Sequence, residues 1–171
     1  MRPANPHLRH AIDSDLDAIL ALERATEHAP HWSPSTYIRI LDSADPRRCL
    51  IVALAERSLV GFAVGLMEPT ALNSAACIAE LETVVVDIGV RRAGIGQALC
   101  LATFDWCRSH GATEIVLEVR AASDGAIALY AGLGFAQTGR RPRYYRNPDD
   151  DAILMRLPLV SSATLKESSQ T

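Results

Sequence analysis

Residues 84–97 read Val84-Val85-Val86-Asp87-Ile88-Gly89-Val90-Arg91-Arg92-Ala93-Gly94-Ile95-Gly96-Gln97. The valines are typical of a buried strand and the apolar spacing after Gly94 is helical, so this stretch predicts a strand that turns directly into a helix. Small residues at Ala93, Gly94 and Gly96 would let the backbone approach a pyrophosphate, towards which the free amides of the first helical turn point. Arg91 and Arg92 could add charge-assisted hydrogen bonds. An ordinary tight turn is the alternative.

Two common phosphate-binding patterns are missing from the sequence. It contains neither GxxxxGK[ST], the loop of many ATP-binding proteins, nor GxGxxG, the dinucleotide-binding turn. If the turn binds phosphate, we therefore expect a phosphate-bearing cofactor of another kind.

Length and charge limit the class of protein. A chain of 171 residues, 49% of them hydrophobic, fits one compact domain, which we place at residues 1–160. Residues 161–171 are polar and lack apolar periodicity, so we expect a disordered tail. The net charge of −3 argues against a broad nucleic-acid-binding face, which needs a basic surplus.

The cysteines and the apolar runs exclude further classes. Cys49, Cys77, Cys100 and Cys107 show no CxxC spacing and no nearby paired histidines, so we expect buried thiols and no metal site. The longest apolar stretch, residues 49–55, is far shorter than a membrane span, and no basic leader precedes an apolar run. We therefore expect a cytoplasmic protein without a membrane partner.

Hydrophobic patterning over the rest of the chain predicts alternating strands and helices. Ser33-Pro34 is a helix start, and Tyr37, Ile38 and Leu41 would form the apolar stripe of that helix. Strands that first form a meander and then alternate with helices predict an α/β fold with a mixed sheet and helices on both faces. The expected strands are residues 8–12, 49–55, 59–66, 79–86, 114–120, 136–145 and 151–157, and the expected helices are residues 13–28, 33–41, 94–110 and 123–133.

A carboxylate interrupts the otherwise apolar strand at residues 114–120. Alternation places Glu118 on one face with Val116 and Arg120, and the remaining apolar residues on the other. A carboxylate in a central strand is costly unless it is paired or functional. Glu118 therefore either forms an ion pair with Arg120 or carries chemistry.

Several of these motifs together resemble one enzyme family. Arg91-Arg92-Ala93-Gly94-Ile95-Gly96 is similar to the (Q/R)xxGx(G/A) signature of the GNAT superfamily of N-acetyltransferases. Leu117-Glu118-Val119-Arg120, Ala126-Ile127-Ala128-Leu129-Tyr130, Leu133-Gly134-Phe135 and Tyr144-Tyr145 resemble its bacterial ribosomal-protein-alanine acetyltransferase subfamily. The resemblance implies the GNAT fold, a mixed and mostly antiparallel sheet of about seven strands flanked by about four helices.

The resemblance also implies a cosubstrate and catalytic residues. Acetyl-CoA would bind through the turn, and Glu118 would act as general base with Tyr130 as general acid. Ser123 stands where the subfamily usually has an asparagine near the coenzyme. The coenzyme-binding residues implied are Val84, Val85, Val86, Arg91, Arg92, Ala93, Gly94, Ile95, Gly96, Gln97, Ser123 and Tyr130, and the amides of residues 84–86 would polarise the thioester carbonyl. A core role for the Tyr130 ring is the alternative.

The acceptor would be a primary amine. A model α-amino group titrates near pH 8 and a lysine near 10.4, so an N-terminal amine is easier to deprotonate at neutral pH. The acceptor-binding residues implied are Trp32, Glu82, Tyr144 and Tyr145, although Trp32 could equally be a core residue. Glu80 and Glu82 are fallback bases. Acetylation of a small amine and a non-catalytic acyl-CoA-binding regulator remain alternatives.

Overall fold

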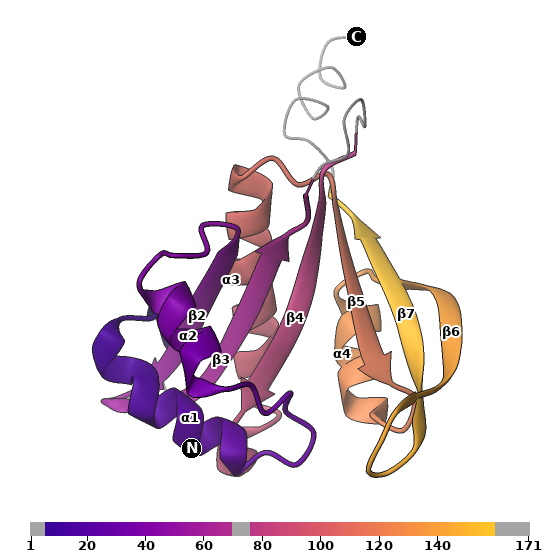
Figure 1. Ribbon diagram of the computed structural model, residues 1–171. Coiled ribbons are helices and arrows are strands. Elements are labelled where there is room, and N and C mark those ends of the chain that lie inside the picture. Colours follow the sequence, from indigo (N-terminus) through magenta and orange to yellow (C-terminus); the bar gives the residue numbers. More distant parts are fainter. Residues whose placement is uncertain (1–5, 70–75, 160–171) are drawn as a thin grey trace, which may run out of the picture. The chain divides into compact units, whose positions relative to one another are not determined.

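The computed structural model of the protein describes residues 6–69 and 76–159, so the tail predicted at residues 161–171 lies outside the described residues. Its strands form a seven-stranded sheet in the order β1-β2-β3-β4-β5-β7-β6. The order of strands and helices confirms the one predicted (Figure 1). The strands are β1 His7–His10, β2 Arg48–Ala55, β3 Ser58–Met67, β4 Ile78–Val86, β5 Glu114–Arg120, β6 Ala136–Tyr145 and β7 Asp150–Pro158, and the helices are α1 Leu16–Arg24, α2 Pro34–Leu41, α3 Ile95–Ser109 and α4 Asp124–Gly132.

The contacts of the chain group into two compact units. The first unit comprises Met1–Leu66 and Leu81–Trp106, and the second comprises Met67–Glu80 and Cys107–Thr171. Strand β4 contributes its first residues to the second unit and the rest to the first. A single domain over residues 1–160 stays a prediction.

In the first unit, helices pack on both faces of the strands. Strand β2 pairs antiparallel with β3, as the hairpin pattern predicted. Alternation along β2 sends Leu50 and Val52 into a core with Ile19 and Tyr37 of α1 and α2. Cys49, Ile51 and Ala53 face the opposite core, which contains Ile95 and Leu99 of α3. The two cores place α1 and α2 on one face of β2 and α3 on the other.

Helix α2 begins where the sequence predicts but buries a different stripe. Ser33 occupies the N-cap position and Pro34 the first turn. Tyr37 is fully buried, whereas Ile38 is 42% exposed and Ile40 is buried instead. The prediction for Ile38 was therefore wrong, because the spacing from Tyr37 to Ile40, three residues, follows the core-facing side of the helix.

Helix α1 is shorter than predicted. It ends at Arg24 and not near His28. The hydroxyl of Thr26 donates to the Leu22 carbonyl at 2.9 Å, and the amide of Ala29 donates to the Thr26 carbonyl at 3.1 Å. A threonine that binds the preceding backbone competes with helical hydrogen bonding, which accounts for the turn after Arg24.

Gly61 of β3 permits a close approach beneath α3. A Cβ atom at this position would lie 2.9 Å from the Val85 carbonyl oxygen and 3.0 Å from Leu99 Cδ1. These distances are too short for an added carbon without movement of the neighbours. The missing side chain of Gly61 therefore sets how β4 and α3 pack in the first unit.

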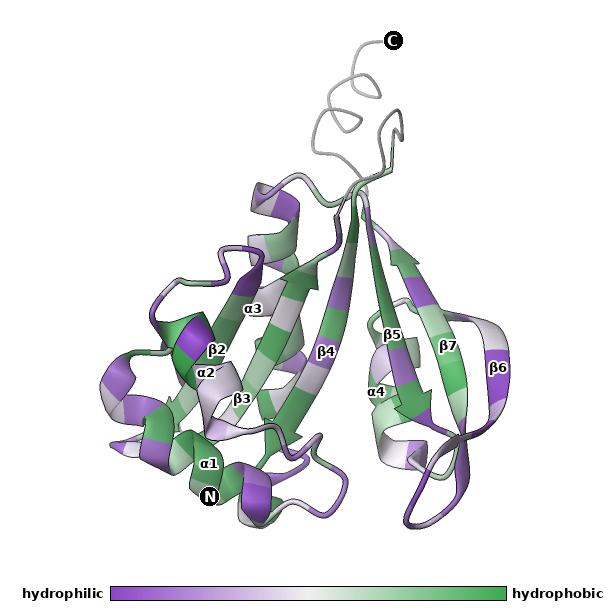
Figure 2. Ribbon diagram, in the orientation of Figure 1, coloured by the Kyte–Doolittle hydropathy of each residue, from purple (hydrophilic) through white to green (hydrophobic). Residues whose placement is uncertain are grey.

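The second unit is built around β5. The start of β4 pairs with β5 in parallel, from Ile78 opposite Glu114 to Glu80 opposite Val116. Strand β7 pairs antiparallel with all of β5, and β6 pairs antiparallel with β7. Most of β7 is hydrophobic, whereas β6 carries strongly hydrophilic positions (Figure 2). No helix in the described ranges is long and apolar enough to cross a membrane.

Candidate active site

The turn between β4 and α3 contains two residues with a left-handed backbone conformation. Arg92 and Gly94 adopt positive φ angles of 63° and 81°. A Cβ atom at Gly94 would meet nothing within 4 Å, so the left-handed backbone and not crowding favours glycine there. The amide of Ala98 donates to the Gly94 carbonyl at 3.0 Å, which closes the first turn of α3. The amides before Ala98 belong to the part of a helix that lacks intrahelical partners.

The side chains of this turn divide between structure and solvent. Ile95 is buried in the core of the first unit, whereas Arg91, Arg92 and Gln97 are exposed. The Nε atom of Arg91 donates to the Val86 carbonyl at 3.2 Å, and this hydrogen bond stabilises the turn. The Asp87 carboxylate also braces it by accepting from the Gly89 amide at 2.7 Å. An anionic ligand would fit exposed arginines beside helix-terminal amides.

Glu82 is held by an arginine from the neighbouring hairpin. Arg48 donates from Nε and Nη2 to the two carboxylate oxygens of Glu82, at 2.7 and 2.8 Å. Its Nη1 also lies 2.5 Å from Asp45 Oδ2. The hydrogen bond with Glu82 raises the pKa of Arg48 above its ordinary value. Both carboxylate oxygens of Glu82 are thus engaged by one guanidinium, a geometry that disfavours Glu82 as the base.

A buried carboxylate that the sequence analysis missed anchors Trp32. Glu23 of α1 is 2% exposed, and its Oε1 accepts from the Tyr37 hydroxyl at 2.6 Å and from the Trp32 amide at 3.0 Å. The Trp32 ring, itself partly buried, lies 5.6 Å from the Tyr37 ring between centroids. A core role and a role in acceptor binding thus both remain possible for Trp32. Glu23 could have been found, because it continues the helical spacing of Leu16, Ile19 and Leu20.

In the second unit, Glu118 pairs with an arginine other than the one expected. Burial alternates along β5 as predicted, with Glu118 partly buried. Its Oε1 lies 2.5 Å from Arg141 Nη1 of β6. Arg120 donates instead to the carbonyls of Arg146 and Pro148, at 3.1 and 3.0 Å. Glu118 thus forms an ion pair, as one of the two alternatives stated, but with Arg141, because β7 and β6 bring a second guanidinium to the same face.

Tyr144 of β6 contacts this ion pair, and Tyr145 packs against Tyr144. A hydrogen bond with Glu118 raises the pKa of Tyr144, and the guanidinium of Arg141 lies 5.4 Å from the centre of the Tyr144 ring. Burial raises the pKa of Tyr145 to about 12. The two rings pack edge to face, 5.1 Å apart between centroids. Both phenols therefore stay neutral near pH 7 and can donate hydrogen bonds.

Helix α4 supplies the other predicted catalytic residue. Tyr130 is 9% exposed, and its ring packs against Phe135 with centroids 5.8 Å apart. Ser123 is the N-cap residue of α4, and its carbonyl accepts from the Ile127 amide at 3.0 Å. The Tyr130 ring thus serves the core of the second unit, which is compatible with a hydroxyl that acts in catalysis.

A metal centre is not evident in the described part of the chain, where no cluster of three histidine, cysteine or acidic side chains could hold a metal ion.

Comparison with known proteins identifies the family. The model of the acetyltransferase (GNAT) family matches residues 16–135. The chain belongs to this family. Its seven-stranded mixed sheet with four helices, seen in the described residues, is the GNAT fold.

Three curated relatives have similar sequences. The [ribosomal protein bS18]-alanine N-acetyltransferase of Escherichia coli is 34% identical over 152 residues, which cover 85% of this chain and 93% of that enzyme. The N-alpha-acetyltransferase RimI of Mycobacterium tuberculosis is 34% identical over 129 residues, covering 73% of this chain and 74% of that one. An uncharacterised protein of Mycobacterium leprae is 35% identical over 129 residues, which cover 73% of this chain. The match covers only 33% of that longer protein.

Solved structures agree with the sequence relatives. The ribosomal-protein-S18-alanine N-acetyltransferase of Escherichia coli has a TM-score of 0.74 at 28% identity, over 92% of this chain and 97% of that one. A Salmonella typhimurium protein solved with its cofactor acetyl-CoA has a TM-score of 0.78 at 19% identity, over 94% and 97% of the two chains, and therefore shows the fold alone. Together with the sequence relatives, the E. coli structure supports an acetyl-CoA-dependent N-terminal acetyltransferase.

Proposed function

We propose that this chain transfers the acetyl group of acetyl-CoA directly to the α-amino group at a protein N-terminus, such as that of a ribosomal protein. The family supports it, as do the names of two relatives, the ribosomal-protein-alanine N-acetyltransferase of E. coli and the N-alpha-acetyltransferase of M. tuberculosis. The observation that carries the proposal is the partly buried carboxylate of Glu118, contacted by Arg141 and by Tyr144. A cytoplasmic location stays a prediction.

Glu118 accepts the proton that the attacking amine must lose. The bond between the amine nitrogen and the acetyl carbon forms as the carbon–sulfur bond breaks, and Tyr130 donates a proton to the departing thiolate. An α-amine suits this base better than a lysine, since the α-amine loses its proton more readily. Backbone amides of Val84, Val85 and Val86 polarise the carbonyl.

The turn before α3 binds the diphosphate of the cosubstrate. The exposed Arg91 and Arg92, the open space above Gly94 and the first amides of α3 fit an anion. Ala93, Ile95, Gly96 and Gln97 complete this binding segment, and Ser123 contributes a hydroxyl from the N-terminus of α4. Trp32, Glu82, Tyr144 and Tyr145 contact the acceptor peptide, and Arg48 orients Glu82 through hydrogen bonds to both of its carboxylate oxygens.

The test is release of free coenzyme A from acetyl-CoA with three acceptor sets: peptides with a free α-amine, lysine peptides blocked at the N-terminus, and small amines. We expect turnover on α-amine peptides, with kcat reduced about 100-fold or more in Glu118→Gln and in Tyr130→Phe. Glu114→Gln is the matched control, since it removes another carboxylate of β5, which pairs with Arg156 at 3.4 Å.

Three outcomes would contradict the proposal. Turnover confined to small amines would favour the alternative of a small-molecule acetyltransferase. Coenzyme binding with no turnover on any acceptor would favour the alternative of a non-catalytic acyl-CoA-binding regulator. Wild-type kcat in Glu118→Gln would remove the proposed base, most clearly if Glu82→Gln lost the activity instead.

A further inference from the structure

Glu118 and Arg141 meet across an intervening strand on one face of the second unit. Strand β7 places Leu154 opposite Glu118 and Ala152 opposite Arg120, and β6 then places Arg141 opposite Ala152. Paired residues of neighbouring strands share a face, so Arg141 and Glu118 lie on the same one.

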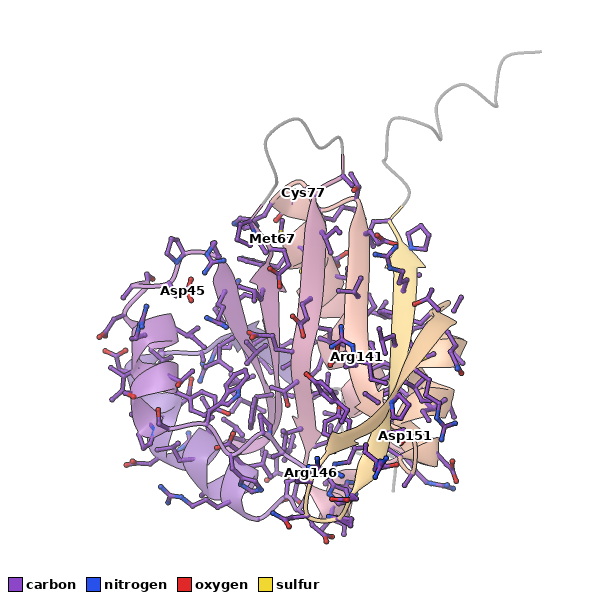
Figure 3. All side chains as sticks on the ribbon, turned by 45° about the vertical axis from the view of Figure 1, so that its right-hand side comes forward. Asp45, Met67, Cys77, Arg141, Arg146 and Asp151 are labelled. Carbon is purple, nitrogen blue, oxygen red and sulfur yellow. The ribbon has the colours of Figure 1, made fainter. Side chains whose placement is uncertain are left out.

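A bulge in β6 brings Arg141 and Tyr144 to this carboxylate together. The register with β7 shifts between Arg141 and Tyr145, and Arg143 adopts a positive φ of 49°. Asp151 of β7 fixes the bulge, because its carboxylate accepts from the Arg143 amide at 2.7 Å and from Arg140 Nε at 2.6 Å. Arg141 and Asp151 are labelled in Figure 3 on adjacent strands. The bulge at Pro142 and Arg143 therefore brings Arg141 and Tyr144, which flank it, to the carboxylate of Glu118.

Arg141 has a second partner close by. Its side chain is 52% exposed, whereas that of Glu118 is 24% exposed. An ion pair with one partner so exposed is weak and easily exchanged. The Tyr144 ring, 5.4 Å from the guanidinium, offers a cation–π contact that does not need the carboxylate. Arg141 can therefore leave Glu118 without losing every favourable contact.

We propose that Arg141 is a displaceable counterion, which the α-ammonium group of the acceptor replaces at Glu118, so that Arg141 selects for acceptors that carry a positive amino terminus. The inference rests on the proposed function, in which Glu118 receives the amine. A guanidinium and an ammonium compete for one carboxylate because both are cations with N–H donors. An acceptor with a blocked, neutral terminus cannot displace Arg141, and neither can the acetylated product.

The same exchange would assist product release. Acetylation turns the charged amine into a neutral amide, which no longer competes for the carboxylate. Arg141 then returns to Glu118, and the acetylated peptide loses its ionic contact. The ion pair seen between Arg141 and Glu118 is thus the resting arrangement of this part of the second unit.

The test measures the Kd of a short alanine-initiated peptide by calorimetry in the presence of coenzyme A, with the full chain. We expect Arg141→Met and Arg141→Gln to bind the peptide about threefold more tightly than wild type, a small factor because the competing ion pair is exposed. The KM for acetyl-CoA should not change. Thermal melting checks that both variants are folded.

The matched control is Arg156→Met. Arg156 Nη1 lies 3.4 Å from Glu114, also a glutamate of β5, and its side chain is 48% exposed against 21% for the glutamate. This variant removes the same charge from a similar pair, so its peptide Kd should equal that of wild type. An equal gain in Arg156→Met would show a general effect of net charge and would overturn the counterion role.

The Glu118→Gln background separates this inference from the proposed function. Competition for the carboxylate predicts that Arg141→Met has no effect on peptide Kd once Glu118→Gln is present, as a double-mutant cycle measures. Weaker or unchanged peptide binding in both Arg141 variants would overturn the inference. If Glu118→Gln still abolishes turnover in that case, the proposed function stands.

Discussion

The hydroxyl of Tyr37 donates a 2.6 Å hydrogen bond to Glu23 Oε1, and both side chains are almost fully buried in the first unit. The same carboxylate oxygen accepts from the Trp32 amide, so one buried charge joins α1, α2 and the segment between them. A buried carboxylate without donors is costly, which makes this network a point where single substitutions act strongly.

Tyr37→Phe should lower the free energy of unfolding by about 1.5–3 kcal/mol, the range for a hydrogen bond to a charged group. The variant keeps the ring that packs against Phe62, with centroids 6.0 Å apart, and removes only the donor to Glu23. Urea denaturation at pH 7 measures the change. A loss below about 0.5 kcal/mol would show that the hydroxyl contributes little.

The pH dependence of stability should also report on Tyr37. Burial and, next, the hydrogen bond to Glu23 raise the pKa of Tyr37 above its ordinary value, so the folded protein favours the neutral phenol. The stabilisation is complete below about pH 10, where an unfolded tyrosine titrates, and falls as pH rises further. Unfolding free energies at pH 8 to 11 should therefore decline less steeply in Tyr37→Phe. Parallel curves for the two proteins would contradict this assignment.

Glu23 also shows what limits prediction from sequence. Strand β5 was predicted with its observed bounds, because strict alternation of apolar residues marks a half-buried strand. The helical spacing places Glu23 on the apolar stripe of α1, but its partners Trp32 and Tyr37 become evident only when the helices pack. The sequence also did not identify Arg141 as the ion-pair partner of Glu118, for a related reason. Arg120 is near in sequence, whereas Arg141 depends on the register of two further strands.

Gly94→Ala should weaken coenzyme binding. The added Cβ has open space, so the cost, about 1 kcal/mol, arises from the positive φ of 81° and would move the turn. We expect the Kd for acetyl-CoA to rise about fivefold or more. Gly111→Ala is the control, since Gly111 has a φ of 90° and equally open surroundings after α3. It should lose similar stability with unchanged coenzyme affinity, and equal affinity losses would contradict a binding role for the turn.

Gly61→Ala should destabilise the first unit by about 1–3 kcal/mol, the usual cost of overpacking. Its Cβ would lie within 3.0 Å of both the Val85 carbonyl oxygen and Leu99. Gly139→Ala offers a comparison within another strand, because its Cβ would meet Leu154 at an ordinary 3.8 Å. Thermal denaturation should show a clearly lower Tm for the first variant only. Similar Tm values would mean that β4 and α3 adjust at little cost.

The thiols should differ sharply in reactivity. Cys49, Cys100 and Cys107 are buried, whereas Cys77 is partly exposed. Burial raises the pKa of Cys100 and of Cys107 to about 12, so at pH 8 only about one molecule in 10,000 carries the reactive thiolate at each site. A disulfide reagent at pH 8 should therefore modify Cys77 rapidly and the others only after denaturation. Cys77→Ser should remove the rapid phase.

The same labelling tests direct transfer. If the amine attacks acetyl-CoA itself, no cysteine carries the acetyl group, and protein modified at Cys77 should keep the acetylation rate of untreated protein. Mass spectrometry after reaction with acetyl-CoA alone should find no thioester on the chain. An acetylated cysteine that forms and decays at the rate of turnover would replace direct transfer with a covalent intermediate, and Glu118 would then have to activate a thiol as well as an amine.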